Sequence, residues 1–238
     1  MEYPKTAKYD KQFVKDNLMG PNALKILEEL TLDLGLQPGM RVLDLGCGKG
    51  FTSIFLAKEF GVQVFATDLW ISATENYNRF KQLGLDNQII PIHADANDLP
   101  YADEYFDAAI SVDAYHYFGE SETFVDEKLT PLIKPNGVIA LAFPGLKKDI
   151  HDRLPPEFFL SWAAKDLEAF HSCEWWANLL SKSRKISIKS IGELSCHDEC
   201  WRDWLATDNP YAVRDRPAME AGAGKHMNLI SVLATRKP

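Results

Sequence analysis

The amino-acid sequence predicts an α/β fold built on a doubly wound parallel sheet. Short apolar runs alternate with helical segments from residue 40 to residue 143, and a glycine-rich turn follows the first of these runs. Alternation of this kind is typical of open sheets that carry helices on both faces. The length of 238 residues suits one such core. We therefore expect a single domain over residues 1–238.

The predicted core spans residues 40–143. Its strands are marked by short apolar runs that end at Gly, Pro, Asn or Asp, and its helices by apolar residues at helical spacing. In chain order the expected strands are 40–45, 62–67, 88–93, 105–112 and 137–143, and the expected helices are 51–60, 72–83 and 120–133. A turn is expected at 135–137, before the fifth strand.

The N-terminal region 8–34 precedes this core. Residues 8–18 and 21–34 are each expected to form a helix, because Pro21 suits a first turn and leucines recur on one face. These helices are expected to cover one edge of the sheet or a cofactor.

The pattern changes after the fifth expected strand. Residues 155–181 are rich in aromatic side chains and predict a long helical stretch, which we interpret as a lid inserted over residues 150–182. The C-terminal region 185–238 follows as a β-hairpin region. Its expected elements are a β-like run at 185–191, a helix around Trp201 and Trp204, a turn-rich segment after that helix, and a last strand at 227–235.

The composition excludes several classes of partner. The net charge of −8 lacks the excess of Lys and Arg that binds phosphate backbones, so nucleic acid is not an expected partner. No stretch approaches the roughly 18 apolar residues of a membrane span, and no secretory signal is visible. The four cysteines form no CxxC pair, which fits a reducing compartment. We expect a cytoplasmic protein that acts on a small molecule, with its oligomeric state left open.

Residues 196–200 have the residue types of a metal site, but we expect no metal there. Four-ligand zinc sites need a second, matching pair of ligands, and only His171 and Cys173 are available at a distance from Cys196 and Cys200. Two ordinary thiols near the start of a helix are the favoured interpretation.

The glycine-rich sequence DLGCGKG at 44–50 lies between the first expected strand and the next helix, where open α/β sheets bind ligands. Glycines there allow a sharp turn and a close approach of the backbone to a ligand, although a tight turn also needs glycine for structural reasons alone. The dinucleotide pattern G-x-G-x-x-G fails, because its third glycine position is Phe51, and the Gly-Lys-Ser/Thr of a Walker A loop is missing. A nucleotide-like ligand other than a dinucleotide or ATP is favoured.

Carboxylates follow three successive expected strands. Besides Asp44, Asp68 ends the second strand and could accept both hydroxyls of a ribose, and Asp95 follows the third and could accept an adenine amine. The alternatives are a helix N-cap for Asp68 and a turn aspartate for Asp95. The three together are more informative than any one of them.

The sequence VLDLGCGKG at 42–50 resembles the first motif of class I S-adenosylmethionine (SAM) dependent methyltransferases throughout, and the likeness extends over about residues 39–143. The resemblance implies a Rossmann-like, seven-stranded sheet with an antiparallel last strand, because the two terminal β-like segments are similar to the edge hairpin of this superfamily. It also implies SAM as the cofactor, S-adenosylhomocysteine as the product and methyl transfer as the reaction.

The resemblance also implies roles for single residues. Gly46 and Gly48 would line the methionine and ribose, Asp68 would hold the ribose, and Asp95 with Ala96 would meet the adenine. Residues 111–113 would flank the methionine amine, and residues 19–21 are similar to the segment that closes over the cofactor in small-molecule members. The expected cofactor-binding residues are Met19, Gly20, Asp44, Gly46, Cys47, Gly48, Gly50, Asp68, Leu69, Asp95, Ala96 and Asp113.

Within the superfamily, the chain generally resembles the ubiquinone/menaquinone-type or cyclopropane-synthase-like group. The GCGKG sequence at 46–50 lacks the tryptophan that follows the second glycine in cyclopropane synthases, which puts a lipid alkene substrate in doubt. The sequence DAYHY at 113–117 departs from the Asn-Pro-Pro-Tyr type of many enzymes that methylate amino groups of DNA or protein. We expect a small-molecule acceptor that is methylated at nitrogen, oxygen or carbon.

Candidate catalytic residues follow the fourth expected strand. His116 has an intrinsic pKa suited to a general base for a hydroxyl or ammonium acceptor, or it merely hydrogen-bonds a neighbouring loop. Tyr115 and Tyr117 are expected to orient the acceptor or to pack against the following helix.

The expected lid carries His171, Trp175 and Trp176, and the first two share one helix face at i, i+4 spacing. Aromatic walls suit a flat ring or, through cation–π attraction, an amine, and they are also common in ordinary cores.

Two other functions stay open as alternatives. A catalytically inactive SAM-binding regulator or adaptor would keep the cofactor motif. An NAD-dependent oxidoreductase would share the fold but requires the glycine pattern that fails at Phe51.

Overall fold

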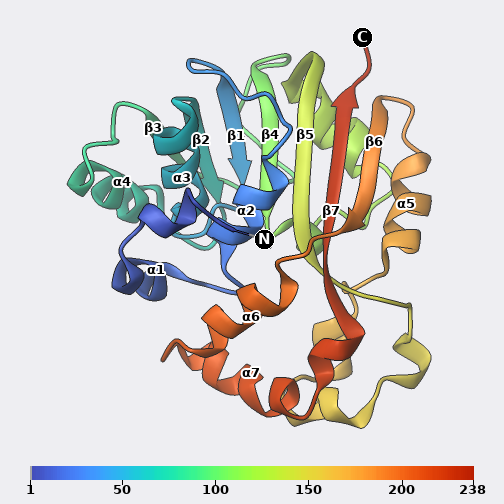
Figure 1. The fold of residues 1–238 in the computed structure, drawn as a ribbon. Coiled ribbons are helices and arrows are strands. Elements are labelled where there is room, and N and C mark those ends of the chain that lie inside the picture. The colour runs from blue at the N-terminus through green and yellow to red at the C-terminus, as the bar shows by residue number, and fades with distance from the viewer. Residues whose placement is uncertain (1) are drawn as a thin grey trace.

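The computed structural model describes residues 2–238 and has one seven-stranded sheet with helices on both faces (Figure 1). The strand order is β3-β2-β1-β4-β5-β7-β6, and only β7 runs antiparallel to its neighbours. The strands are β1 (Arg41–Leu45), β2 (Gln63–Asp68), β3 (Ile89–His93), β4 (Phe106–Val112), β5 (Ile133–Leu146), β6 (Ile186–Glu193) and β7 (Met227–Arg236). The predicted doubly wound, seven-stranded fold with its antiparallel last strand is thus confirmed.

The α-helices are shorter than the sequence pattern predicts at several ends. They are α1 (Lys11–Asn17), α2 (Ala23–Leu30), α3 (Phe51–Phe60), α4 (Ala73–Gln82), α5 (Cys173–Ser181), α6 (His197–Leu205) and α7 (Pro210–Glu220). The side chain of Asp10 caps α1 by accepting from Phe13 N–H, and Asn22 caps α2 through Leu24 N–H. In the part of the chain described here, no helix is long and apolar enough to cross a membrane.

Two hydrophobic cores form because alternate residues of each strand point to opposite faces of the sheet. Val42 of β1 belongs to the core on the face that α2 and α3 cover, while its neighbour Leu43 belongs to the core on the other face, which also contains Trp176 of α5. The strands are therefore apolar on both sides, as expected of a sheet covered by helices.

The segment 120–133 was expected to be one regular helix, and this prediction is wrong. It contains a π-helical turn (Val125–Leu129) followed by a 3-10 turn (Thr130–Leu132). Pro131 lacks the N–H that a continuing α-helix needs at that position. Strand β5 then begins at Ile133, and the expected turn at 135–137 is an irregularity within it, where Asn136 has a positive φ of 64°.

The long helix expected over 155–181 is also wrong. Short 3-10 turns at His151–Arg153, Pro156–Leu160 and Ala164–Leu167 precede α5, which starts only at Cys173. The Ser172 side chain accepts from Trp175 N–H and begins a new helix there. Conversely, α7 lies in a segment expected to be turn-rich, and it is capped by Asn209 with Pro210 in its first turn.

Candidate active site

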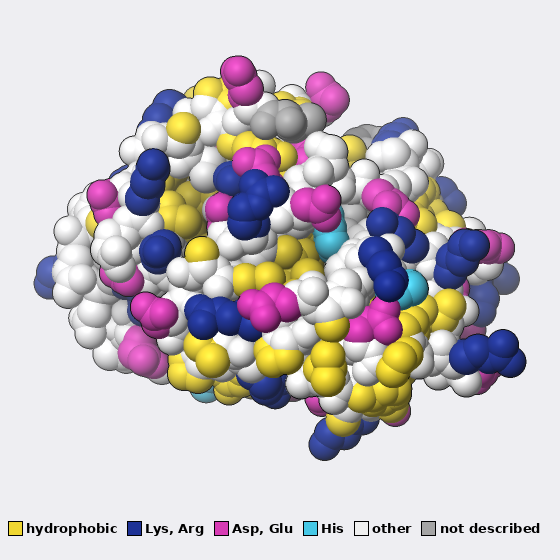
Figure 2. Space-filling view, turned by 60° about the horizontal axis from the view of Figure 1, so that its bottom comes forward, with side chains coloured by type: hydrophobic (Ala, Val, Ile, Leu, Met, Phe, Trp, Pro, Cys, Tyr) yellow, Lys and Arg dark blue, Asp and Glu magenta, His cyan; other side chains and the backbone are white. Residues whose placement is uncertain are grey.

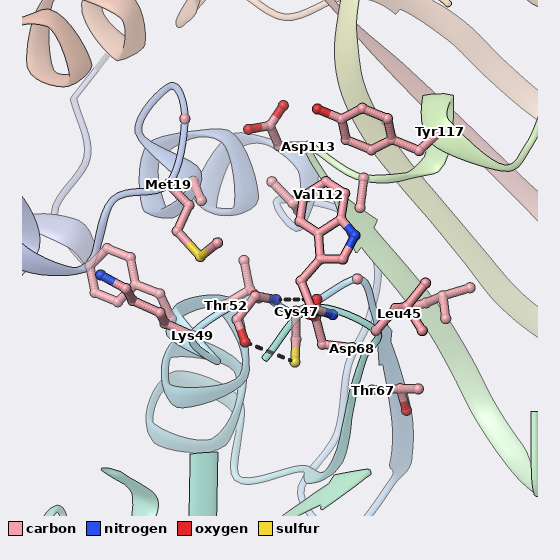
Figure 3. Close-up of a pocket in the computed structure, with 18 of the residues that line it drawn as sticks. Met19, Leu45, Cys47, Lys49, Thr52, Thr67, Asp68, Val112, Asp113 and Tyr117 are labelled. Carbon is pink, nitrogen blue, oxygen red and sulfur yellow. Dashed lines mark hydrogen bonds between the residues drawn. The ribbon is translucent and has the colours of Figure 1, made fainter. Parts of the chain in front are cut away.

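A cavity of about 370 Å³ lies where β1, β2 and β4 end, on the edge of the sheet that carries the loops to the following helices. Residues 17–23 of the N-terminal region close one side of it (Figure 3). Eleven of the expected site residues line it: Met19, Gly20, Gly46, Cys47, Gly48, Asp68, Leu69, Asp95, Ala96, Asp113 and Tyr117. The volume is in the range of pockets that enclose a small ligand.

The glycine loop after β1 is held against the end of β2. The backbone N–H groups of Gly46 and Cys47 both donate to the Thr67 carbonyl oxygen, at 2.8 and 3.1 Å. Gly46 has a φ of 76°, and a Cβ atom there would lie 2.3 Å from the Cβ atom of Ala114. Glycine is therefore required at position 46 by both backbone conformation and packing.

Two expected site residues of the 44–50 sequence do not line the cavity. Asp44 is buried beneath the loop, where its Oδ2 accepts hydrogen bonds from the hydroxyls of Thr52 and Ser53 at 2.6 and 2.5 Å. Burial raises the pKa of Asp44 to about 6. Gly50 precedes the first residue of α3 and faces the Phe80 ring. Both residues therefore support the loop without lining the cavity.

Asp68 accepts more hydrogen bonds than the other acidic side chains that line the cavity. Its Oδ2 accepts from Gly48 N–H at 2.7 Å, and its Oδ1 accepts from the N–H groups of Trp70 and Ile71 at 2.8 and 2.9 Å. It does not cap α4, because Ser72 forms the N-cap in a capping box with Glu75. A carboxylate offers about four lone-pair sites, so Asp68 keeps one for a ligand hydroxyl.

Leu69, Asp95 and Ala96 line the part of the cavity near the end of β3. Asp95 is exposed, and its Oδ1 accepts from the backbone N–H of Asn97 at 2.8 Å and from the side-chain amide at 3.0 Å. These two hydrogen bonds lower the pKa of Asp95. The local geometry is that of the turn aspartate considered above, with the carboxylate still at the cavity wall.

Asp113 follows β4 with an unusual backbone conformation, a φ of 58°. Its N–H donates to the Ala142 carbonyl oxygen at 2.7 Å, and its Oδ2 occupies the position just 2.1 Å from where a Gly20 side chain would begin. Only glycine at position 20 permits this approach. Burial, and then the charge of Asp215, raise the pKa of Asp113 to about 7.

Among the three candidate catalytic residues, the structure brings only Tyr117 to the cavity. Its ring is exposed and packs edge-on against Trp70, with ring centroids 5.3 Å apart. Tyr115 is fully buried between Phe143 and Trp176. All three candidates lie in one 3-10 turn (Tyr115–Tyr117), which sends successive side chains in different directions.

His116 is 1% exposed, and neither of its ring nitrogens has a hydrogen-bond partner among residues 2–238. Burial lowers its pKa to about 3, so the imidazole is neutral near pH 7. It does not line the cavity. His116 therefore does not lie at the cavity, where a general base would have to be. Nor does it hydrogen-bond a neighbouring loop among the described residues.

If the chain catalyses the methyl transfer that the resemblance implies, we expect His116→Phe to leave turnover within about tenfold of the parent, because a general base contributes 10²–10⁴-fold. In the parent, the depressed pKa means that folding stability is present above about pH 6.5 and is lost as pH falls toward 3, by up to about 1.4 kcal/mol per pH unit. Chemical unfolding at several pH values should show a shallower acid loss in the variant. A 100-fold fall in turnover with intact folding would restore His116 as the base.

None of the three expected lid residues lines the cavity. The His171 ring stacks on Trp175 with centroids 3.6 Å apart and planes 8° apart, although His171 precedes α5 rather than lying in it. Trp176 is fully buried in the core between α5 and the sheet. Within this segment α5 packs against β6 and the turn Pro156–Leu160 packs against α7, and no residue of 150–182 lines the cavity.

Sequence reasoning missed several cavity-lining residues. They include Asn17, Leu18, Lys49, Trp70 and Phe118. Trp70 and Lys49 adjoin residues that the motif singled out, so proximity in sequence was a usable signal for both. Asn17 and Leu18 reach the cavity only because α1 ends beside it, for which the sequence carries no local signal.

The model of a protein family described as a methyltransferase domain matches residues 42–137 of the chain. The glycine/sarcosine/dimethylglycine N-methyltransferase of Actinopolyspora halophila is 30% identical over 124 residues, which are 50% of this chain and 21% of that protein. The 27-O-demethylrifamycin SV methyltransferase of Amycolatopsis mediterranei is 29% identical over 118 residues, 49% of this chain and 43% of that protein. The matches thus span less than half the length of these relatives.

Solved structures share the fold over nearly the whole chain. A phosphoethanolamine N-methyltransferase of Haemonchus contortus in complex with SAM has a TM-score of 0.74 at 18% identity, over 100% of this chain and 60% of that one. The geranyl diphosphate C-methyltransferase of Streptomyces coelicolor in complex with S-adenosylhomocysteine has a TM-score of 0.69 at 15% identity, over 89% and 77%.

The residues at the cavity fit SAM, the cofactor of this family. Asp68 keeps a lone pair toward the cavity, and Gly48 leaves the backbone open where a Cβ atom would meet the Met19 sulfur at 2.8 Å. Asp113 lines the same cavity with a carboxylate that accepts no hydrogen bond from residues 2–238. The glycine loop, the strand order and the family match agree. Residues 42–137 therefore carry a methyltransferase domain, and the chain is similar to class I SAM-dependent methyltransferases.

Proposed function

We propose that this protein transfers a methyl group from SAM to the nitrogen of a small amine. The observation that carries the proposal is the carboxyl group of Asp113, which lines the cavity and accepts no hydrogen bond from residues 2–238. Its side chain is half-buried, and a carboxylate in such a place without a partner is costly unless a cation neutralises it. An ammonium group in the cavity would supply that charge.

The surroundings of Asp113 strengthen the preference for a cation. The carboxylate of Asp215 lies close enough to raise its pKa, and Asp215 itself is fixed by the indole N–H groups of Trp162 and Trp204, at 2.9 and 3.0 Å. Lys49 is the one cationic side chain among the lining residues, and its Nζ donates to the Asp16 carbonyl oxygen. The acceptor end of the cavity is therefore anionic.

Aromatic side chains complete this end. Figure 3 shows Tyr117 beside Asp113, on the opposite side of the cavity from Cys47 and Asp68. Trp70 packs against Tyr117, and both rings are more than half exposed. Ring faces near an anionic group attract amines through cation–π interactions, worth about 0.5–2 kcal/mol each.

The chain's own residues would prepare the amine for attack. When bound, SAM supplies an electrophilic methyl group on a positively charged sulfur. The Asp113 carboxylate would take one proton from the ammonium and free its lone pair, and its pKa of about 7 matches that task near neutral pH. Tyr117 and Trp70 would hold the acceptor in line, since alignment supplies most of the rate enhancement in a displacement of this kind.

A hydroxyl acceptor is the second candidate. The same pKa of about 7 at Asp113 suits a general base that removes a proton from an alcohol or phenol. The relatives leave both acceptors open, because one is named as an N-methyltransferase of glycine derivatives and another as a methyltransferase of a rifamycin. The anionic, aromatic acceptor end favours the amine.

A large polyanion is a poor candidate acceptor. On the face shown in Figure 2, acidic and basic side chains are interspersed around apolar ones, rather than basic side chains gathered into a patch. With a net charge of −8, this surface supports a small molecule as the acceptor.

The test is a methyl-acceptor screen with the purified protein and SAM, in which S-adenosylhomocysteine formation is followed for amines and for the alcohols of the same carbon skeleton. Turnover with amines, lost in Asp113→Asn, would support the proposal. Turnover with alcohols alone would favour the second candidate. Tight binding of S-adenosylhomocysteine without turnover on any acceptor would favour a regulator, and a preference for NADH would favour an oxidoreductase.

A further inference from the structure

A second polar cluster lies beyond the end of β5, among residues that do not line the cavity. Asp149 and His151 follow β5, His171 precedes α5, and one ligand-type atom from each lies within 4.8 Å of the others. Two imidazoles and one carboxylate are a recurrent ligand set for divalent transition metals. We propose that Asp149, His151 and His171 bind one such ion, of the class represented by Zn²⁺.

The surroundings of His171 are those of a metal ligand. Its Nε2 lies 3.0 Å from Oε1 of Glu120, and its Nδ1 is buried without a hydrogen-bond partner in the described chain, 3.7 Å from Oδ1 of Asp149. A carboxylate accepts the proton of Nε2, so the lone pair is left on Nδ1. Metal-ligating histidines usually donate their other ring N–H to a carboxylate or a carbonyl in this way.

His151 has a matching arrangement. Its Nε2 lies 3.2 Å from the Leu167 carbonyl oxygen, which can only accept, so Nε2 carries the proton and Nδ1 presents its lone pair. Asp149 is oriented by Ser172, whose N–H donates to Oδ1 at 2.9 Å and whose hydroxyl donates to Oδ2. Each carboxylate oxygen keeps a lone pair. All three ligand groups are therefore positioned by contacts that leave a coordinating atom free.

The cluster is also preorganised and suitably charged. The His171 ring is held flat against Trp175 at 3.6 Å, so little side-chain freedom is lost on binding. The carboxylates of Asp149 and Glu120 balance the two positive charges of the ion. Imidazole ligands favour Zn²⁺ and neighbouring transition metals, whereas Mg²⁺ and Ca²⁺ prefer sites made of oxygen atoms. The ion would tie the 3-10 turns after β5 to the start of α5.

The test is titration of the untagged, metal-free protein with Zn²⁺ by calorimetry, with Co²⁺ absorption as a second readout. We expect one ion per chain, loss of binding in His171→Ala and in the half-exposed His151→Ala, and about 10–100-fold weaker binding in Glu120→Gln. Ni²⁺ should quench tryptophan fluorescence in the parent, and less so in Trp175→Phe, because Trp175 stacks on His171.

The control is His226→Ala, since His226 also pairs with a carboxylate, Glu157 at 3.1 Å, but lies outside the cluster. It should bind Zn²⁺ like the parent. Unchanged affinity in His151→Ala and His171→Ala, both checked for folding by circular dichroism, would overturn the proposal. Intense Co²⁺–thiolate absorption that disappears in Cys196→Ser would overturn it too, by placing the ion at the cysteines.

Discussion

Replacing Asp68 with alanine is expected to weaken the binding of S-adenosylhomocysteine at least about 100-fold. The carboxylate has one lone pair left for the ligand and also fixes the glycine loop through Gly48 N–H at 2.7 Å. Hydrogen bonds to a charged group contribute about 1.5–3 kcal/mol each, and about 3 kcal/mol corresponds to roughly 100-fold in affinity. Calorimetric titration of the purified variant measures the change directly.

Because Asp68 also fixes the glycine loop, two further variants are needed to separate an effect on ligand binding from an effect on folding. Asp68→Asn keeps the size of the side chain and one accepting oxygen, so it can keep either the hydrogen bond from Gly48 or those from Trp70 and Ile71. It should disturb the loop less than alanine does and still lose most of the affinity. Asp98→Ala removes one exposed charge at the same edge of the sheet and should bind normally. Parent-like affinity in both Asp68 variants would remove this residue from the cofactor site.

Asp113→Asn is expected to reduce kcat/KM by 100-fold or more, because it removes the proton acceptor and the charge facing the acceptor amine. In the parent, Asp113 has a pKa of about 7, so activity should rise as pH increases through 7 and the carboxyl group ionises. The variant should lose that rise. Binding of S-adenosylhomocysteine separates two roles, since it weakens in Asp113→Asn only if this carboxylate holds the methionine amine of the cofactor.

The same substitution is expected to stabilise the free protein at alkaline pH. The pKa of Asp113 is raised from 3.8 in the unfolded chain to about 7, so its contribution to stability is full below about pH 4 and is lost as pH rises to 7. The loss amounts to up to about 1.4 kcal/mol per pH unit. Asparagine does not titrate, so urea unfolding should show an advantage of the variant at pH 8 that vanishes near pH 4.

Asp107→Asn serves as the control for stability. The Asp107 carboxylate accepts hydrogen bonds from Lys134 and from Arg41 N–H, so its loss should destabilise the protein at pH 8. If Asp113→Asn also destabilised the protein at pH 8, the carboxylate of Asp113 would have to be satisfied in the free state, and the argument for a cationic ligand would fail.

Some errors of the sequence prediction arose where the sequence itself held the missing signal. Asn209 followed by Pro210 is a helix start, and α7 begins there, although the segment was expected to be turns. Pro131 likewise excludes the regular helix expected over residues 120–133. At these places the prediction relied on apolar and aromatic content and did not apply the local signals that start and end helices.

The lid and the metal cluster could not be read from the sequence. The side chain of Trp176 is equally suited to a core and to a lid, and its burial follows from how α5 packs on the sheet. Asp149 and His171 are brought together because Leu146 N–H, at the end of β5, donates to the His171 carbonyl oxygen at 3.1 Å. A contact between residues so far apart in the sequence cannot be predicted from their spacing.

The sequence by itself determined the doubly wound core, the glycine loop and the placement of Asp68 at the end of β2. These features depend on strand periodicity and on turn residues, which act over a few positions, and parallel strands then bring their ends to one edge. Only the tertiary structure decided which of Asp113 and His116 lines the cavity. They are three positions apart in one loop, and the positive φ of Asp113 turns its carboxylate to the cavity while packing against Tyr117 and Phe170 buries His116. Which side chain meets the ligand is set by long-range packing, because local sequence does not fix the direction of a side chain in an irregular turn.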